Sequence, residues 1–193
     1  MKHLAALTLS ALSLVACSNS NTSTHYYSLQ TPHIVATPHI VAYHSLGVGP
    51  IKLPSLLDRE GVVMRTNAHS LHISDKYLWG GQLEDEFLRA LSRQLQARLP
   101  NTLIQMLPWE VQQSPQAQIA VQVDQFDGQL GQQAVLSGHW ELQQPRDGKI
   151  LGTQNFNLVI TLADKKVDTL INAQAQLVSQ LAAQIAAQIA ASL

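Results

Sequence analysis

Residues 71–100 read LHISDKYLWGGQLEDEFLRALSRQLQARLP, where a strand pattern is followed directly by a helix pattern. Leu71 and Ile73 alternate with polar residues, which is typical of a half-buried strand. Further along, large apolar residues recur at four-residue spacing and predict one apolar helix face; they are Leu83, Phe87, Leu91, Leu95 and Leu99. Acidic residues gather near the helix start and Pro100 ends it, so we expect a helix over residues 83–99.

A β-hairpin is predicted immediately before this helix. Residues 61–65 form its first strand, Asn67-Ala68 supplies the turn, and residues 69–73 form its second strand. Upstream, residues 47–53 read as a strand that Gly49-Pro50 interrupts. Residues 25–29, HYYSL, are aromatic-rich and strand-like as well.

Further extended segments follow the helix, over residues 102–107, 117–126, 135–142 and 150–162. Because the turns between consecutive strands are short, we expect antiparallel pairing among them.

The last segment, residues 169–193, carries no charged side chain and predicts a second helix. Its glutamines form a polar stripe beside an apolar one, which argues against a membrane-spanning helix. We expect the glutamine stripe to be an outer face that meets solvent or another protein. The predicted fold class is α/β, with α+β as the alternative: a single domain in which two main helices pack on a mixed β-sheet.

The composition is that of a globular protein with few charges. Its 193 residues are enough for one domain with a core, and apolar residues make up 46% of them. Charged residues make up only 13% and the net charge is −1, so we expect neither nucleic acid as a partner nor a polybasic membrane-binding surface.

The N-terminus has the pattern of an export signal. Lys2 precedes an apolar run too short to span a membrane, and small residues lead into Cys17, the only cysteine. Residues 14–17, LVAC, resemble the bacterial lipobox, which implies cleavage before Cys17 and a covalent lipid on its thiol. We therefore expect a signal peptide over residues 1–16, a lipidated Cys17 with its tether over residues 17–24, and a domain over residues 25–193.

The tether limits how far the domain can move from its membrane. Residues 18–24, SNSNTST, span at most about 25 Å when extended, so a partner rooted in another membrane has to reach the domain. In enteric-type bacteria, Ser at the position of Ser18 usually accompanies sorting to the outer membrane.

The hexamer TPHIVA occurs twice in succession, at residues 31–36 and 37–42. We interpret it as a duplication in a surface loop rather than as a metal site built from His33 and His39, because loops tolerate insertions at small entropic cost.

No catalytic or cofactor motif occurs in the sequence. The GxxxxGK[ST], GxSxG and HExxH patterns are absent, and we expect no enzyme, no catalytic residue, no metal and no cofactor beyond the lipid on Cys17. His69 and His72 would point to opposite faces of a strand, which disfavours a metal pair.

A series of short motifs covers residues 47–79. VGPIKLP at residues 48–54 is followed by Leu57-Asp58-Arg59, then by Val63-x-Arg65, and finally by Tyr77-Leu78-Trp79 just before the helix. In this order and spacing the motifs resemble the PqiC-type (YmbA-like) family of ABC-transport auxiliary lipoproteins. Gly80-Gly81 stands where that family usually has acidic residues or proline after its tryptophan.

The resemblance implies a non-enzymatic role in lipid traffic between the two membranes of a Gram-negative envelope. It implies an adaptor that is lipid-anchored at the periplasmic face of the outer membrane. Its partner would be an MCE-domain protein that is rooted in the inner membrane and extends across the periplasm. Self-association into a homo-oligomer is left open, and the alternative function is an outer-membrane assembly or envelope-integrity lipoprotein of another system.

The candidate partner contacts lie in these motifs, at Asp58, Arg59, Tyr77 and Trp79. Asp58 and Arg59 are adjacent opposite charges, and two interpretations apply to them: a structural ion pair or a docking contact.

Overall fold

A computed structural model of the chain describes residues 23–30 and 37–191. Its strands and helices follow the order β1 His25–Tyr27, β2 Ser45–Lys52, β3 Gly61–Arg65, β4 Leu71–Trp79, α1 Leu83–Arg98, β5 Leu103–Met106, β6 Ala117–Gln129, β7 Gln133–Gln143, β8 Ile150–Thr161 and α2 Val167–Ala191. Two short 3-10 turns, η1 Ser55–Leu57 and η2 Val111–Gln113, precede β3 and β6. The predicted helix over residues 83–99 is confirmed, as is the hairpin before it.

The strands form two sheets. The larger has the order β5-β2-β6-β7-β8, in which β2 runs parallel to both β5 and β6 while β6, β7 and β8 are antiparallel. The smaller has the order β1-β4-β3, with β1 parallel and β3 antiparallel to β4. The prediction of a mixed sheet is confirmed.

The antiparallel pairing expected for residues 102–107 is wrong. These residues form β5, which lies beside β2 in parallel, so that β2 separates β5 from β6. The connection between β5 and β6, which contains η2, carries the chain from one side of β2 to the other before β6 begins.

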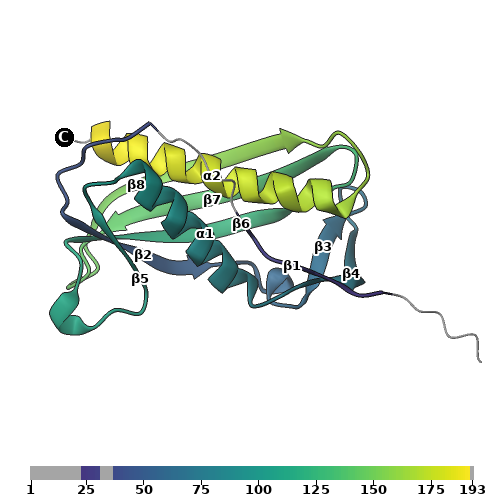
Figure 1. Ribbon diagram of the computed structural model, residues 1–193, viewed down its shortest axis with the longest axis horizontal. Helices are drawn as coiled ribbons and strands as arrows, with labels where there is room; N and C mark the ends of the chain where they lie inside the picture. Colours follow the sequence, from purple (N-terminus) through teal and green to yellow (C-terminus); the bar gives the residue numbers. More distant parts are fainter. Residues whose placement is uncertain (1–22, 31–36, 192–193) are drawn as a thin grey trace, which may run out of the picture.

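Both helices lie on the same face of the larger sheet (Figure 1). α1 contacts β2 and β5, and α2 contacts α1, β6, β7 and β8. Between α1 and the sheet, the ring of Phe87 on α1 packs edge to face against that of Phe126 on β6, with ring centroids 5.4 Å apart. The predicted α/β domain with two main helices packed on a mixed sheet is therefore the observed one.

The glutamine stripe on α2 is not uniformly an outer face. α2 begins at Val167, two positions before the predicted start at Thr169, and the side chain of Gln174 is only 1% exposed. Its Nε2 donates to the backbone oxygen of Phe126 at 3.4 Å. Because α2 packs against both α1 and the sheet, its buried face is wider than the apolar stripe alone. Within the described residues, no helix is both long and apolar enough to span a membrane.

A buried polar cluster joins the two helices. The Arg98 guanidinium of α1 donates to the Gln94 side chain at 2.6 Å and to Ser179 Oγ of α2 at 3.1 Å. Ser179 Oγ in turn donates to Gln94 Oε1 at 2.9 Å. Burial lowers the pKa of Arg98 from its ordinary value, since the charged form loses hydration.

Gly49 and Pro50 bend β2 without ending it. The register of β2 against β6 shifts between Val48 and Ile51, which marks a β-bulge at these two residues. Gly49 has a φ of 113°, a conformation that glycine adopts without the strain a side chain would impose. The predicted strand over residues 47–53 thus continues through its interruption to Lys52.

Candidate functional site

Three of the four predicted partner contacts, Asp58, Arg59 and Trp79, lie where the smaller sheet meets the N-terminus of α1. The connection from η1 to β3 carries Asp58 and Arg59, and β4 ends at Trp79 one short turn before α1. The Trp79 backbone N–H donates to the backbone carbonyl oxygen of Glu60 at 2.7 Å, and the Gly80 backbone N–H donates to the backbone carbonyl oxygen of Tyr27 at 2.7 Å. These bonds fasten three segments that are distant in sequence into one rigid corner.

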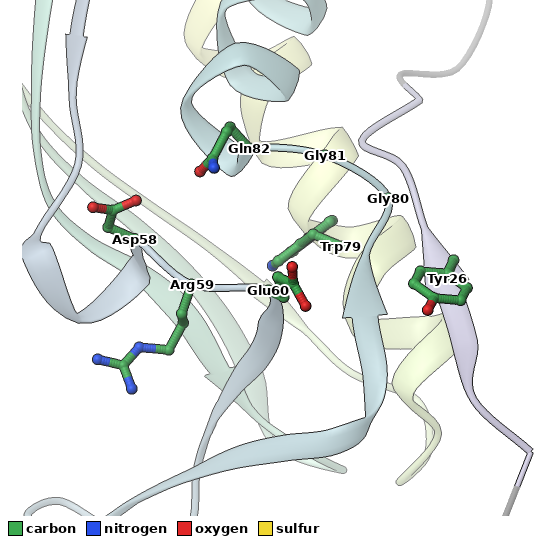
Figure 2. A pocket seen from close by; sticks show the side chains of 8 residues that line it. All are labelled: Tyr26, Asp58, Arg59, Glu60, Trp79, Gly80, Gly81 and Gln82. Carbon is green, nitrogen blue, oxygen red and sulfur yellow. The ribbon is translucent and has the colours of Figure 1, made fainter.

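A cavity of about 410 Å³ opens in this corner. It is lined by Tyr26, Asp58, Arg59, Glu60, Trp79, Gly80, Gly81 and Gln82. Figure 2 shows Trp79 and Glu60 lying between Tyr26 on one side and Asp58 with Gln82 on the other. Tyr26 is 70% exposed, whereas Trp79 is only 4% exposed.

Asp58 and Arg59 do not form an ion pair with each other. Figure 2 shows the Arg59 guanidinium extending away from the Asp58 carboxylate. The ion pairs among the described residues lie elsewhere: Arg65–Asp127, Arg89–Glu86 and Lys166–Asp164. The structural ion-pair interpretation is therefore wrong: both side chains are exposed, and they are not within ion-pair distance of each other.

A second cavity of about 470 Å³ adjoins the first, since Asp58 and Gln82 line both. Its other lining residues are Leu53, Ser55, Leu57, Leu83, Glu84 and Asp85. We call the two cavities together the η1–α1 groove. Carboxylates at positions 58, 60, 84 and 85 outnumber the single guanidinium of Arg59, so the groove favours a partner that presents basic groups.

Tyr77 lies outside the η1–α1 groove. Its ring packs against those of His25 and Tyr27 of β1, at centroid distances of 5.6 and 6.2 Å. The Tyr27 hydroxyl donates to Asp168 of α2 at 2.9 Å, and the pKa of Tyr27 rises to about 12 through burial and the nearby carboxylate. Tyr77 thus holds β1 against β4, and the structure does not bring it together with Asp58, Arg59 and Trp79.

Tyr26, Glu60 and Gln82 are groove residues that the sequence did not point out. Glu60 immediately follows the Leu57-Asp58-Arg59 motif and Gln82 lies three residues after Trp79, so their proximity to these motifs was a usable signal. Tyr26 reaches the groove only because β1 pairs in parallel with β4, with Tyr26 opposite Leu78. No local pattern predicts that pairing.

Other predicted features lie partly or wholly outside the described residues. Cys17, its tether up to Thr22 and the first TPHIVA hexamer are outside them. The second hexamer is anchored at His39, whose backbone N–H donates to the Arg98 oxygen at 2.7 Å. Within the described part of the chain, His, Cys, Asp and Glu side chains form no group of three or more arranged to hold a metal ion.

Comparisons with known proteins agree on one family. The model of the family described as "ABC-type transport auxiliary lipoprotein component" matches residues 27–186. The intermembrane transport lipoprotein PqiC of Escherichia coli K12 is 27% identical over 139 residues, which cover 70% of this chain and 72% of that protein. Its counterpart from Shigella flexneri matches to the same extent.

Two solved structures share the fold. A crystal structure of an uncharacterized protein superposes with a TM-score of 0.70 at 24% identity and covers 86% of this chain and 99% of its own. A protein from Xanthomonas campestris superposes with a TM-score of 0.66 at 14% identity and covers 89% and 94% of the two chains.

Proposed function

Since this chain belongs to the family of ABC-type transport auxiliary lipoprotein components, we propose that it is the outer-membrane adaptor of an intermembrane lipid-transport system. In this role it is a non-enzymatic lipoprotein that docks a periplasm-spanning MCE-domain protein through the η1–α1 groove. The similarity to an intermembrane transport lipoprotein supports the type of transport.

The observation that carries the proposal is that the tether and the groove share one end of the domain. The tether leads directly into β1 at His25, and the next residue, Tyr26, lines the groove. With a lipid on Cys17, residues 18–24 would hold this end within about 25 Å of the membrane. A partner seated in the groove would therefore have its tip close to the membrane surface, where lipid is delivered or collected.

The chemistry of the groove suits a protein partner better than a small polar substrate. Its rim is acidic and its floor includes the buried apolar side chains of Leu57, Trp79 and Leu83. Interfaces of this kind combine an apolar centre with a charged rim that sets orientation. The rim carboxylates at Asp58 and Glu60 are exposed, so they are available to pair with basic groups of a partner.

The proposal is tested by affinity purification of the full-length tagged lipoprotein from envelope membranes. We expect an MCE-domain protein to co-purify with the native chain. Glu60→Lys reverses a rim charge and should lower that recovery about tenfold, the effect of losing ~1.4 kcal/mol of binding. Asp75→Lys makes the same charge change on the exposed face of β4, outside the groove, and should leave recovery unchanged.

Two results would overturn the docking role. One is that no MCE-domain protein is recovered with the native chain. The other is that Glu60→Lys and Asp75→Lys recover equal amounts of it. Co-purification of a β-barrel assembly protein in its place would favour the alternative envelope function.

A further inference from the structure

A separate hollow of about 310 Å³ lies between α1 and the edge strand β5. It is lined by Arg89, Ser92, Arg93, Gln96, Ile104 and Met106. We call it the α1–β5 groove and infer that it binds the phosphate end of a phospholipid. The inference relies on the proposed function only for the source of the lipid, since the groove is distinct from the one assigned to the protein partner.

The floor of the α1–β5 groove is apolar and open. Ile104 and Met106 lie two apart on β5 and so share the face turned toward α1. Met106 is 47% exposed, and the next residue, Leu107, is 36% exposed. Because β5 is the edge of the larger sheet, none of the described strands covers this side. An apolar path thus leads from the hollow to the molecular surface.

The rim of the α1–β5 groove is positively charged, because two arginines and no carboxylate line it. Arg89 and Arg93 are one helical turn apart on α1 and therefore lie side by side. Arg89 bonds Glu86 at 2.8 Å, whereas Arg93 is exposed and makes no ion pair with any described residue. The uncompensated charge is positive, and the planar donor fork of arginine matches the oxygens of a phosphate group.

Ser92 supplies an independent indication of a ligand. Its side chain is 6% exposed, and its hydroxyl oxygen is buried with no hydrogen-bond partner, although the residue lines the groove. Buried polar atoms normally have partners, so an unpartnered hydroxyl at a cavity wall calls for one. A phosphate or ester oxygen placed between Arg89 and Arg93 would accept its proton.

Gln96 holds the two walls in place and is not itself free to bind. Its Nε2 donates to the oxygens of Leu99 at 3.3 Å and Thr102 at 3.1 Å, and its Oε1 accepts from Ile104 N at 3.3 Å. β5 is therefore fixed against α1 before any ligand arrives. Such a preformed site loses less freedom on binding.

The size of the groove decides which part of the ligand enters. A hollow of about 310 Å³ is at the small end of the ~300–1,000 Å³ found for small-molecule sites. It admits the phosphate and the adjoining glycerol ester, and leaves the acyl chains along Met106 and Leu107. A free phosphate ion would not use the apolar floor, so we assign the site to a phospholipid.

The test uses the whole lipoprotein in growing cells whose phospholipids are labelled with ³²P. A photoreactive p-benzoylphenylalanine replaces Met106, and in a matched strain it replaces Val159, which is 49% exposed on β8 far from the groove. After irradiation and denaturing purification, we expect at least fivefold more ³²P on the chain probed at position 106. Phospholipase treatment should release that label.

Variants in the Met106-probe strain identify the residues that bind. Arg93→Glu and Ser92→Ala should each lower the label several-fold, whereas Arg146→Glu, in the turn between β7 and β8, should not. Ser92→Ala should leave thermal unfolding unchanged or raise its midpoint, because it removes an unpartnered buried hydroxyl.

Three outcomes would overturn the inference: equal label at positions 106 and 159, label that Arg93→Glu does not change, or a cross-linked protein band without ³²P. Inorganic phosphate would wash out on denaturation and leave no label. Failure of the partner to co-purify, with the label intact, would refute the docking role and leave this site standing.

Discussion

Arg65 shows how a short motif residue can serve the fold rather than the binding surface. It belongs to the Val63-x-Arg65 motif, and its guanidinium donates two hydrogen bonds, of 3.2 and 2.7 Å, to the carboxylate of Asp127. The Asp127 side chain is 6% exposed and also accepts from Gln125. Because Arg65 lies on β3 and Asp127 on β6, this pair joins the smaller sheet to the larger one.

Replacing Arg65 should therefore destabilise the protein through Asp127. Arg65→Met leaves a buried carboxylate without its cation, which costs about 3 kcal/mol. Urea denaturation followed by circular dichroism measures this loss. The double variant Arg65→Met/Asp127→Leu should recover most of it, because no charge is left buried. A single variant as stable as the native chain would show that the pair does not join the sheets.

Tyr27 gives a prediction about pH. Its pKa of about 12 lies above the ordinary value of 10.0, so the native state favours the neutral phenol. The resulting stabilisation is fully present below pH 10 and is lost as the pH rises toward 12. Native and Tyr27→Phe proteins should therefore show nearly equal phenolate absorbance at 295 nm near pH 11. A full extra phenolate in the native chain at that pH would refute the Asp168 contact.

At the scale of elements, the sequence predicted what local periodicity determines. The four-residue apolar spacing of α1 and the hairpin around Asn67-Ala68 are local features, and both are confirmed, although β4 begins at Leu71 and not at residue 69 as predicted. β4 runs to Trp79, beyond the predicted end at Ile73, because β1 adds a second backbone partner from distant sequence. The burial of Gln174 likewise depends on α2 packing against both α1 and the sheet, which no periodicity within α2 reveals.

The packing of α1 on α2 depends on a buried hydrogen bond that can be tested. Ser179→Ala removes the Arg98 acceptor on α2 and should destabilise the protein by about 2 kcal/mol, as expected for a bond to a charged group. Ser92→Ala is a matched control, since Ser92 is equally buried on α1 but unpartnered, and it should cost nothing. Chemical denaturation of both variants measures the difference. Equal stabilities would contradict the role of this cluster.

At the scale of the whole molecule, only part of the candidate site could be predicted. Asp58, Arg59 and Trp79 were identified from motifs, and the structure places them around one cavity. Tyr26 joins them through the parallel pairing of β1 with β4, and the α1–β5 groove forms because β5 lies beside α1. Both depend on contacts between segments that are distant in the sequence, and no local sequence pattern specifies those contacts.

The proposed lipid anchor at Cys17 would determine where the molecule acts, and it can be tested by itself. Cys17→Ser removes the only thiol that could carry the lipid, so the precursor should remain uncleaved and unacylated. Membrane fractionation with mass spectrometry of the N-terminus checks both expectations. Acylated Cys17→Ser protein in the outer-membrane fraction would show that the anchor lies elsewhere.

Docking at the η1–α1 groove is tested most directly by cross-linking from Tyr26. With Cys17 lipidated, Tyr26→Cys carries the only free thiol, and a benzophenone maleimide attached there reacts with whatever fills the groove. Val159→Cys, on β8, is the matched control. We predict that irradiation of intact envelopes links an MCE-domain protein to position 26 and not to position 159. No such product at position 26, or equal yields at both positions, would contradict the proposed docking.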